Sequence, residues 1–277
     1  MSDPAQHGPD LEALEEAYER GLAAERAGDA AAAAAAWRDC LAIDPADRGG
    51  AAVRLAALGQ GPSPARASPA YVATLFDQHA ESFEATLVLS LGYSIPEQTA
   101  ETLARLGLGP FARGLDLGCG TGLAGEALED VVETMDGVDL SEGMLEIASE
   151  KEVYETLYAG DAVAFLEGAA AAGYDLVVAT DVLPYLGAVD ALFDGFARVV
   201  APHGVVTFST ETLPAEAFLG TAGWRVGPRQ RYAHDPAMLE RALADRGFTL
   251  RAADPVTVRY ETGAPVAGHL IVARRDT

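Results

Sequence analysis

Cysteine and lysine are scarce in this chain of 277 residues. The two cysteines, Cys40 and Cys119, are too few for a disulfide framework or a metal cluster, so we expect no metal site. Lys151 is the only lysine. Acidic residues number 42 against 19 lysines and arginines, which gives a net charge of -23. A surface this acidic repels phosphate backbones, which argues against a nucleic-acid partner.

Long hydrophobic runs are also lacking, and none reaches the length that crosses a membrane. The first twenty residues, MSDPAQHGPDLEALEEAYER, have no apolar core of the kind found in signal peptides. These absences predict a cytoplasmic protein without a membrane partner. The composition, 49% hydrophobic and 22% charged, is typical of a globular fold, and the length favours one main domain with a smaller appendage.

Residues 10–44 carry apolar side chains at helical spacing, interrupted at Gly28-Asp29 and stopped at Pro45. Their order resembles one tetratricopeptide repeat, whose period is about 34 residues. About three repeats are needed for a stable solenoid, so one and a half cannot form an independent scaffold. We therefore expect a small all-α region over 1–58. Two roles stay open: a module that binds a protein partner, or a cap packed on the main domain or on a second subunit of a homodimer.

The segment GQGPSPARASP, residues 59–69, has the composition of a linker. Residues 70–110 predict two or three helices that form a lid or connection, with Pro96 at the start of the last helix. This stretch holds more aromatic residues than one core stripe needs. We expect these to line an acceptor pocket: Tyr71, Phe76, Phe83 and Tyr93.

From residue 111 onwards, short apolar runs alternate with helical stretches. This alternation predicts an α/β fold with a parallel sheet and helices on both faces. The last two runs, FTLRAADPVTVRYE and PVAGHLIVARRD, are separated by a short turn at Thr262-Gly263. They predict a hairpin, which places an antiparallel strand near one edge of the sheet.

The stretch GLDLGCGTGLAGEALED, residues 114–130, predicts a strand, a glycine turn and a helix. Gly118, Gly120 and Gly122 allow close approach of the backbone to a ligand, and a helix start offers free N–H groups. The dinucleotide fingerprint needs a glycine where Leu123 stands, and a Walker loop needs a lysine. Neither a pyrophosphate nor a triphosphate is therefore favoured. A tight structural turn remains the alternative.

An aspartate lies at the end of each of four consecutive predicted strands: Asp116, Asp139, Asp161 and Asp181. Asp139 follows the glycine turn by the spacing that suits a ribose diol. Asp161 suits an exocyclic amine such as that of adenine, because a carboxylate accepts hydrogen bonds. One such acid is usually a helix N-cap, but four in series favour a ligand site.

Four segments in order, GLDLGCGTG, GVDLSEGML, YAGDAVAFL and YDLVVATDVLPYLG, closely resemble the cofactor motifs of class I S-adenosyl-L-methionine-dependent methyltransferases. The resemblance spans roughly residues 95–275. It implies a Rossmann-like seven-stranded sheet with an antiparallel C-terminal hairpin strand, S-adenosyl-L-methionine as cofactor and S-adenosyl-L-homocysteine as product. The chain also resembles a bacterial group in which tetratricopeptide-like helices precede the methyltransferase domain.

By this resemblance, the glycines line the methionine moiety, Asp139 holds the ribose hydroxyls, and Asp161 accepts from the adenine amine. Leu140 and Met144 flank adenine, Ala162 offers its backbone, and Asp116 lies behind the loop. The full set of implied cofactor contacts is Asp116, Gly118, Cys119, Gly120, Gly122, Asp139, Leu140, Met144, Gly160, Asp161, Ala162 and Thr180.

The catalytic candidates are His79, His234 and Asp181. His79 is expected on one helical face with Phe76 and Phe83, while Asp181 stands where nitrogen-methylating relatives often carry a polar recognition residue. Each also has a structural interpretation, as a hydrogen-bonded histidine or a loop cap.

Tyr185 and Tyr232 join the predicted acceptor pocket, with packing over the sheet edge as the alternative for Tyr185. The sequence predicts methyl transfer to an oxygen or nitrogen of a small molecule. A protein methyltransferase, or a partner-binding protein that uses the helical repeat, is the alternative.

Overall fold

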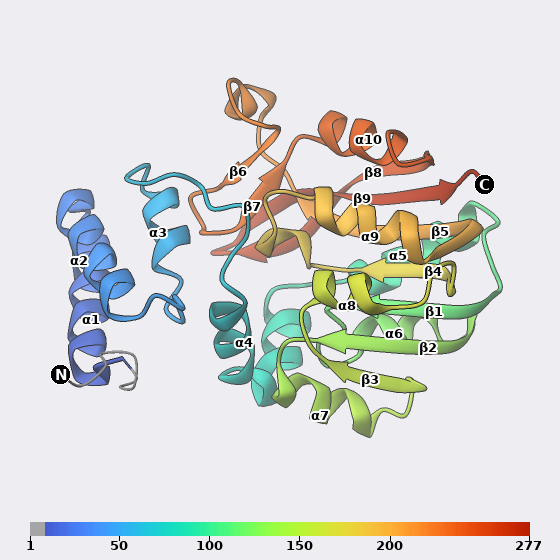
Figure 1. Ribbon diagram of the computed structural model, residues 1–277, viewed down its shortest axis with the longest axis horizontal. Helices are drawn as coiled ribbons and strands as arrows, with labels where there is room; N and C mark the ends of the chain where they lie inside the picture. Colours follow the sequence, from blue (N-terminus) through green and yellow to red (C-terminus); the bar gives the residue numbers. More distant parts are fainter. Residues whose placement is uncertain (1–8) are drawn as a thin grey trace, which may run out of the picture.

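The structure is a computed structural model that describes residues 9–277 and begins with two antiparallel helices, α1 (Leu11–Ala27) and α2 (Ala30–Ile43) (Figure 1). The predicted region 1–58 therefore starts in residues that lie outside the described part. The side chain of Asp10 caps α1, and Gly28 ends it with a left-handed φ of 73°. Asp29 then caps α2. The predicted helix pair is confirmed, with its break at Gly28-Asp29.

The N-terminal helices have a core of their own around Trp37, which is fully buried. Its indole Nε1 donates to Glu25 across 3.0 Å. A Cβ atom on Gly21 would come within 2.6 Å of the Trp37 ring, so α1 and α2 approach closely only because residue 21 is glycine. The helix α3 (Ala51–Ala57) packs against both α2 and the main domain. The helical region is thus joined to the main domain through α3.

Residues 69–105 hold the predicted helices in a more broken form. The helix α4 (Pro69–Asp77) is capped by Ser68 and is followed by a 3₁₀ turn (Ala80–Ser82) and a π-helix (Ala85–Ser90). The last helix, α5 (Ile95–Arg105), has Pro96 in its first turn, as predicted. His79 lies between α4 and the 3₁₀ turn, so the continuous helical face expected for it does not form.

The main domain is built on a sheet with five parallel strands in the order β3-β2-β1-β4-β5. Two long antiparallel strands, β9 and β8, extend it beyond β5 and confirm the predicted hairpin and its turn. Two short strands that the sequence did not predict, β7 and β6, pair at the carboxyl end of β5. The strands are β1 (Phe111–Leu117), β2 (Val132–Asp139), β3 (Thr156–Ala159), β4 (Tyr174–Ala179), β5 (Val200–Glu211), β6 (Trp224–Val226), β7 (Tyr232–His234), β8 (Phe248–Glu261) and β9 (Ala264–Arg275).

Helices cover both faces of the sheet, as Figure 1 shows, because the central strands are apolar on both sides. On one face, Leu166 of α8, Phe193 of α9 and Leu239 of α10 belong to one buried core. On the other face, Leu103 of α5 and Leu128 of α6 form a second core. The helices of the main domain after β1 have the following bounds: α6 (Leu123–Leu128), α7 (Glu142–Glu150), α8 (Ala162–Gly168), α9 (Asp190–Val199) and α10 (Pro236–Ala244). Within residues 9–277, we find no helix with the length and apolar character needed to cross a membrane.

Candidate active site

A pocket of about 990 Å³, counting its open mouth, lies at the carboxyl ends of β1, β2, β3 and β4. This is the edge of an open parallel sheet at which ligands bind. The walls come from the loops after these strands, from α4 and from the chain just before α4. The site therefore combines residues from both halves of the chain.

The glycine loop after β1 forms one wall of the pocket. Gly118 has a φ of 67°, and a Cβ atom there would meet Val182 at 2.6 Å. Gly120 has a φ of 54°, yet a Cβ atom there would meet no atom within 4 Å. Gly160, after β3, is open in the same way. Gly120 and Gly160 both line the pocket, so the backbone at these points leaves room for a ligand.

Asp139, the last residue of β2, is bonded directly to the glycine loop. Its Oδ2 accepts from the Gly120 N–H across 2.8 Å, and its Oδ1 accepts from the Ser141 N–H across 2.8 Å. The residue is 9% exposed and lines the pocket. Burial raises the pKa of Asp139, against the lowering effect of these backbone hydrogen bonds. Since each oxygen has a second lone pair, the carboxylate can still accept from a ligand.

Asp116 lies behind the loop, fully buried, and does not itself line the pocket. Its Oδ2 accepts from the Tyr154 hydroxyl across 2.7 Å, while its Oδ1 has no hydrogen-bond partner among the described residues. Burial raises the pKa of Asp116 to about 7. A buried carboxylate oxygen without a partner is energetically costly, so a donor that reached Asp116 would stabilise this site. The ammonium group of a methionine moiety is a donor of this kind.

Asp161 caps α8 at another part of the pocket, where its Oδ1 accepts from the Ala164 N–H across 3.0 Å. Both carboxylate oxygens also lie 3.1 Å from Nη1 of Arg66. Arg66 comes from the segment predicted to be a linker, and it lines the pocket with Ala67. Nothing in the sequence around Arg66 indicates this role, because the contact joins residues 95 positions apart.

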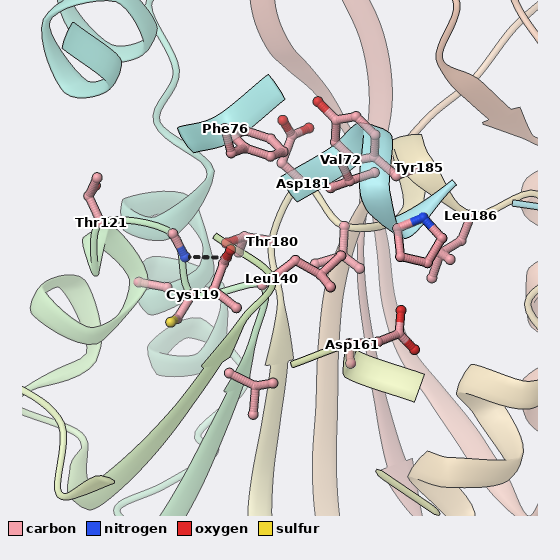
Figure 2. A pocket seen from close by; sticks show the side chains of 18 of the residues that line it. Val72, Phe76, Cys119, Thr121, Leu140, Asp161, Thr180, Asp181, Tyr185 and Leu186 are labelled. Atoms are coloured by element: carbon pink, nitrogen blue, oxygen red, sulfur yellow. Dashed lines mark hydrogen bonds between the residues drawn. The ribbon is translucent and has the colours of Figure 1, made fainter. Parts of the chain in front are cut away.

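The remaining wall of the pocket is aromatic. Figure 2 shows Phe76, Val72 and Tyr185 close to Asp181, with Asp161 in a different part of the pocket. The Phe76 ring packs edge-on against Phe83 and Tyr185, with centroid distances of 5.8 Å and 5.5 Å. Tyr93 also lines this end. Four of the six predicted acceptor residues thus line the pocket, namely Phe76, Phe83, Tyr93 and Tyr185.

Asp181 is the acidic group at the aromatic end. It has a left-handed φ of 57°, which is rare outside glycine, and its N–H donates to Ser209 across 2.8 Å. Its Oδ1 lies 3.6 Å from Nη1 of Arg259, a side chain only 1% exposed. Arg259 also pairs with Glu211 and Glu261, each at 2.6 Å. Arg259 therefore joins three acids, Asp181, Glu211 and Glu261, in a charge network that no local sequence pattern indicates.

The structure corrects the prediction that His79 and His234 are catalytic. His79 is exposed and is not among the residues that line the pocket, because α4 ends at Asp77. His234 is fully buried, with Nδ1 2.8 Å from the Thr210 hydroxyl and Nε2 3.2 Å from the Gly187 carbonyl oxygen. Burial lowers the pKa of His234 to about 4. Neither histidine is placed to act on a molecule in the pocket.

Other predicted residues also lie outside the pocket lining. The Tyr71 ring fills the space beside Gly50, and the Tyr232 hydroxyl donates to the Pro64 carbonyl across 3.0 Å. Met144 is fully buried in α7, and Gly122 lies against Tyr154. These four residues lie outside the pocket and pack against other parts of the chain. The remaining predicted cofactor residues line the pocket: Gly118, Cys119, Gly120, Asp139, Leu140, Gly160, Asp161, Ala162 and Thr180.

The sheet order, the C-terminal hairpin and the glycine loop together define a Rossmann-like methyltransferase fold. Residues 92–253, more than half of the chain, match the family model of the methyltransferase domain, and the chain belongs to this family. It is an S-adenosyl-L-methionine-dependent methyltransferase, an enzyme of class I. Two features of the described residues fit this cofactor: the open space beside Gly120 and Gly160, and the Asp116 Oδ1 atom that has no hydrogen-bond partner among them.

Two similar curated proteins are ubiquinone biosynthesis O-methyltransferases. That of Thiobacillus denitrificans is 31% identical over 184 residues, which cover 58% of this chain and 78% of that protein. That of Paracidovorax citrulli is 30% identical over 190 residues, covering 61% and 80%. Among solved structures, the YcgJ protein of Bacillus subtilis aligns with a TM-score of 0.50 at 14% identity, over 64% of this chain and 97% of that one. This last likeness concerns the fold alone.

Proposed function

We propose that the enzyme transfers the methyl group to an oxygen or nitrogen of a small-molecule acceptor held at the aromatic end of the pocket. The observation that carries the proposal is the division of one pocket into two ends. Figure 2 shows Phe76, Tyr185 and Asp181 together at one end, with Cys119 of the glycine loop and Asp161 in other parts of the pocket. Both relatives named above are O-methyltransferases, which supports a small acceptor with a hydroxyl group.

For the cofactor we propose three contacts within this pocket. The open backbone at Gly120 takes the methionine moiety, with Asp116 behind it as the acceptor for the ammonium group. Asp139 takes the ribose hydroxyls. Asp161 accepts from the adenine amine beside Leu140, which lines the same wall. Asp139 and Asp161 are fixed by backbone hydrogen bonds and Asp116 by the Tyr154 hydroxyl, so little ordering of these acceptors is needed on binding.

When bound, S-adenosyl-L-methionine supplies a methyl group activated by a sulfonium. The chain has then to align the acceptor atom and to exclude water, and alignment alone contributes several kcal/mol, about 7 or more in favourable cases. Phe76, Phe83 and Tyr185 provide the apolar surface for this task. Asp181 lines the aromatic end of the pocket with its side chain 17% exposed, and we propose that its carboxylate accepts a hydrogen bond or proton from the acceptor's hydroxyl or amine.

A protein acceptor or a partner-binding role was the alternative, and the curated relatives give it no support. The N-terminal helices pack through α3 onto Tyr185 and Tyr232, beside the pocket. We therefore favour a cap on the catalytic domain over a free binding module.

Three measurements test the proposal. Titration calorimetry of the full chain with S-adenosyl-L-homocysteine should show binding at micromolar ligand, and a folded protein that fails to bind at millimolar ligand would contradict the cofactor site. A screen with methyl-labelled cofactor should then find acceptors among small phenols, catechols and aromatic amines. Asp181→Asn should keep product affinity within about twofold and lower methyl transfer by roughly 10²-fold. Equal turnover by the variant would exclude Asp181 as the proton acceptor.

A further inference from the structure

Residues 64–67, which we call the strap, run along the pocket between the N-terminal helices and α4. Figure 1 shows this part of the chain passing from α3 past β7 towards α4. The Ala65 carbonyl oxygen accepts from the N–H groups of Gly187 and Ala188, each across 2.8 Å. The Ala67 N–H donates to the Tyr185 carbonyl across 2.9 Å. The strap is thus fixed to the loop after β4 by backbone hydrogen bonds on both sides of Arg66.

A fourth contact holds the strap at its start, where the Tyr232 hydroxyl donates to Pro64 across 3.0 Å. Arg66 itself forms an antiparallel bridge with Leu186, and both residues line the pocket. The backbone of Arg66 therefore cannot shift freely, and its side chain starts from a fixed point beside the cavity.

The side chain of Arg66 reaches the carboxylate of Asp161, with one nitrogen, Nη1, at 3.1 Å from both oxygens. The Oδ1 atom is used further by the Ala164 N–H at the start of α8. One lone pair of Oδ2 therefore remains for another donor. Arg66 and Asp161 are 44% and 22% exposed, so the pair is at the mouth of the pocket and is worth about 1 kcal/mol or less as an isolated ion pair.

We propose that Arg66 is a positioning residue for recognition of the adenine amine, contributed to the cofactor site by the strap. It holds the Asp161 carboxylate in the orientation that leaves Oδ2 free for the amine. The inference rests on the proposed adenine contact of Asp161. It makes the segment before α4 a part of the binding site, and it links the N-terminal helices to cofactor recognition.

The test compares S-adenosyl-L-homocysteine with its inosine analogue, in which a carbonyl oxygen replaces the adenine amine. Calorimetry on the full chain should show that the wild type prefers the adenosine form by about tenfold or more. Arg66→Ala should weaken binding of the adenosine form about fivefold and change binding of the inosine form less than about twofold. Arg66→Lys should recover most of the preference, because one cation can still bridge both oxygens.

The matched control is Arg20→Ala, which removes an exposed arginine paired with Asp39 in the N-terminal helices. It should leave both affinities unchanged. Tyr232→Phe, which frees the strap at Pro64 without removing Arg66, should lower the preference for the adenosine form in the same direction but less than Arg66→Ala does.

Three outcomes would overturn the inference while the wild type still binds S-adenosyl-L-homocysteine. These are an unchanged affinity in Arg66→Ala, a tighter affinity, or an equal loss for both ligands. A tighter affinity would mean that Arg66 competes with the adenine amine for Asp161. An equal loss for both ligands would mean that Arg66 only supports the pocket wall and does not affect recognition of the amine. Failure of the wild type to bind at all would contradict the proposed cofactor site instead, so the two ideas fail separately.

Discussion

The Oδ2 atom of Asp139 accepts a hydrogen bond from the N–H of Gly120 across 2.8 Å, which ties the end of β2 to the middle of the glycine loop after β1. The two strands are parallel neighbours, so their carboxyl ends meet at one edge of the sheet. One carboxylate therefore shapes the loop and faces the cavity at the same time. We therefore expect stability and the proposed cofactor binding to depend on the same side chain.

Replacing Asp139 should separate these two effects. Asp139→Ala removes the acceptor for two backbone N–H groups and for the proposed ribose contact. The affinity for S-adenosyl-L-homocysteine should therefore fall about 10- to 100-fold, and the free energy of unfolding by about 1–3 kcal/mol. Asp139→Asn keeps one acceptor and should recover much of the stability but not the affinity. Calorimetry and urea unfolding measure both. Asp130→Ala, at an exposed acid, serves as control, and unchanged affinity in Asp139→Ala would refute the ribose contact.

Asp116 predicts a pH dependence of stability. Its pKa is raised from the ordinary 3.8 to about 7 by burial, so between these pH values the folded state binds more protons than the unfolded state. The free energy of unfolding should therefore fall as pH rises through this window. The asparagine of Asp116→Asn cannot ionise. The free energy of unfolding of this variant should therefore rise relative to that of the wild type by about 2 kcal/mol from pH 5 to pH 7. Urea unfolding at several pH values checks this, and parallel curves for both proteins would show that Asp116 does not titrate there.

The first two glycines of the loop should respond differently to the same added methyl group. Gly118→Ala forces a Cβ to 2.6 Å from Val182, at a φ of 67°, and should cost about 1–3 kcal/mol of stability. Val182→Ala should relieve part of this loss. Gly120→Ala has open space around the Cβ, so it should cost about 1 kcal/mol yet weaken cofactor-product binding about tenfold or more. Equal affinity in Gly120→Ala and the wild type would show that the ligand does not approach there.

Arg259 should be much more important for stability than its exposed neighbour Arg229. Arg259→Met removes the cation 2.6 Å from the buried Glu211 and leaves Arg231, at 4.0 Å, beside this carboxylate, which should cost about 3 kcal/mol. Arg229→Met removes a half-exposed partner of Glu261 and should change the unfolding free energy by about 1 kcal/mol or less. Denaturant unfolding of both variants provides the comparison. A small loss for Arg259→Met would mean that the network is solvated.

Much of the fold was predictable because its signals are local. Alternating apolar runs and helices indicated the strands of the parallel sheet, and Gly28-Asp29 and Thr262-Gly263 marked turns that the structure contains. The short strands β6 and β7 escaped prediction, since three residues carry no periodic pattern. The helical face of His79 was wrong because α4 ends at Asp77, where tertiary packing replaces a regular helix by 3₁₀ and π turns.

The sequence by itself determined the family, the glycine loop and the acids at the strand ends, because these depend on residue type and spacing along a few neighbouring positions. The tertiary structure alone decided which side chains meet. In the folded protein, His234 is buried in the core and the Phe76 ring packs against Tyr185. Arg66 pairs with Asp161, and Arg259 pairs with Glu211. Three of these contacts join residues that are 48 to 109 positions apart in the sequence: Arg66–Asp161, Arg259–Glu211 and Phe76–Tyr185. Such pairs follow from how sheet, strap and hairpin pack together, and no local pattern encodes them.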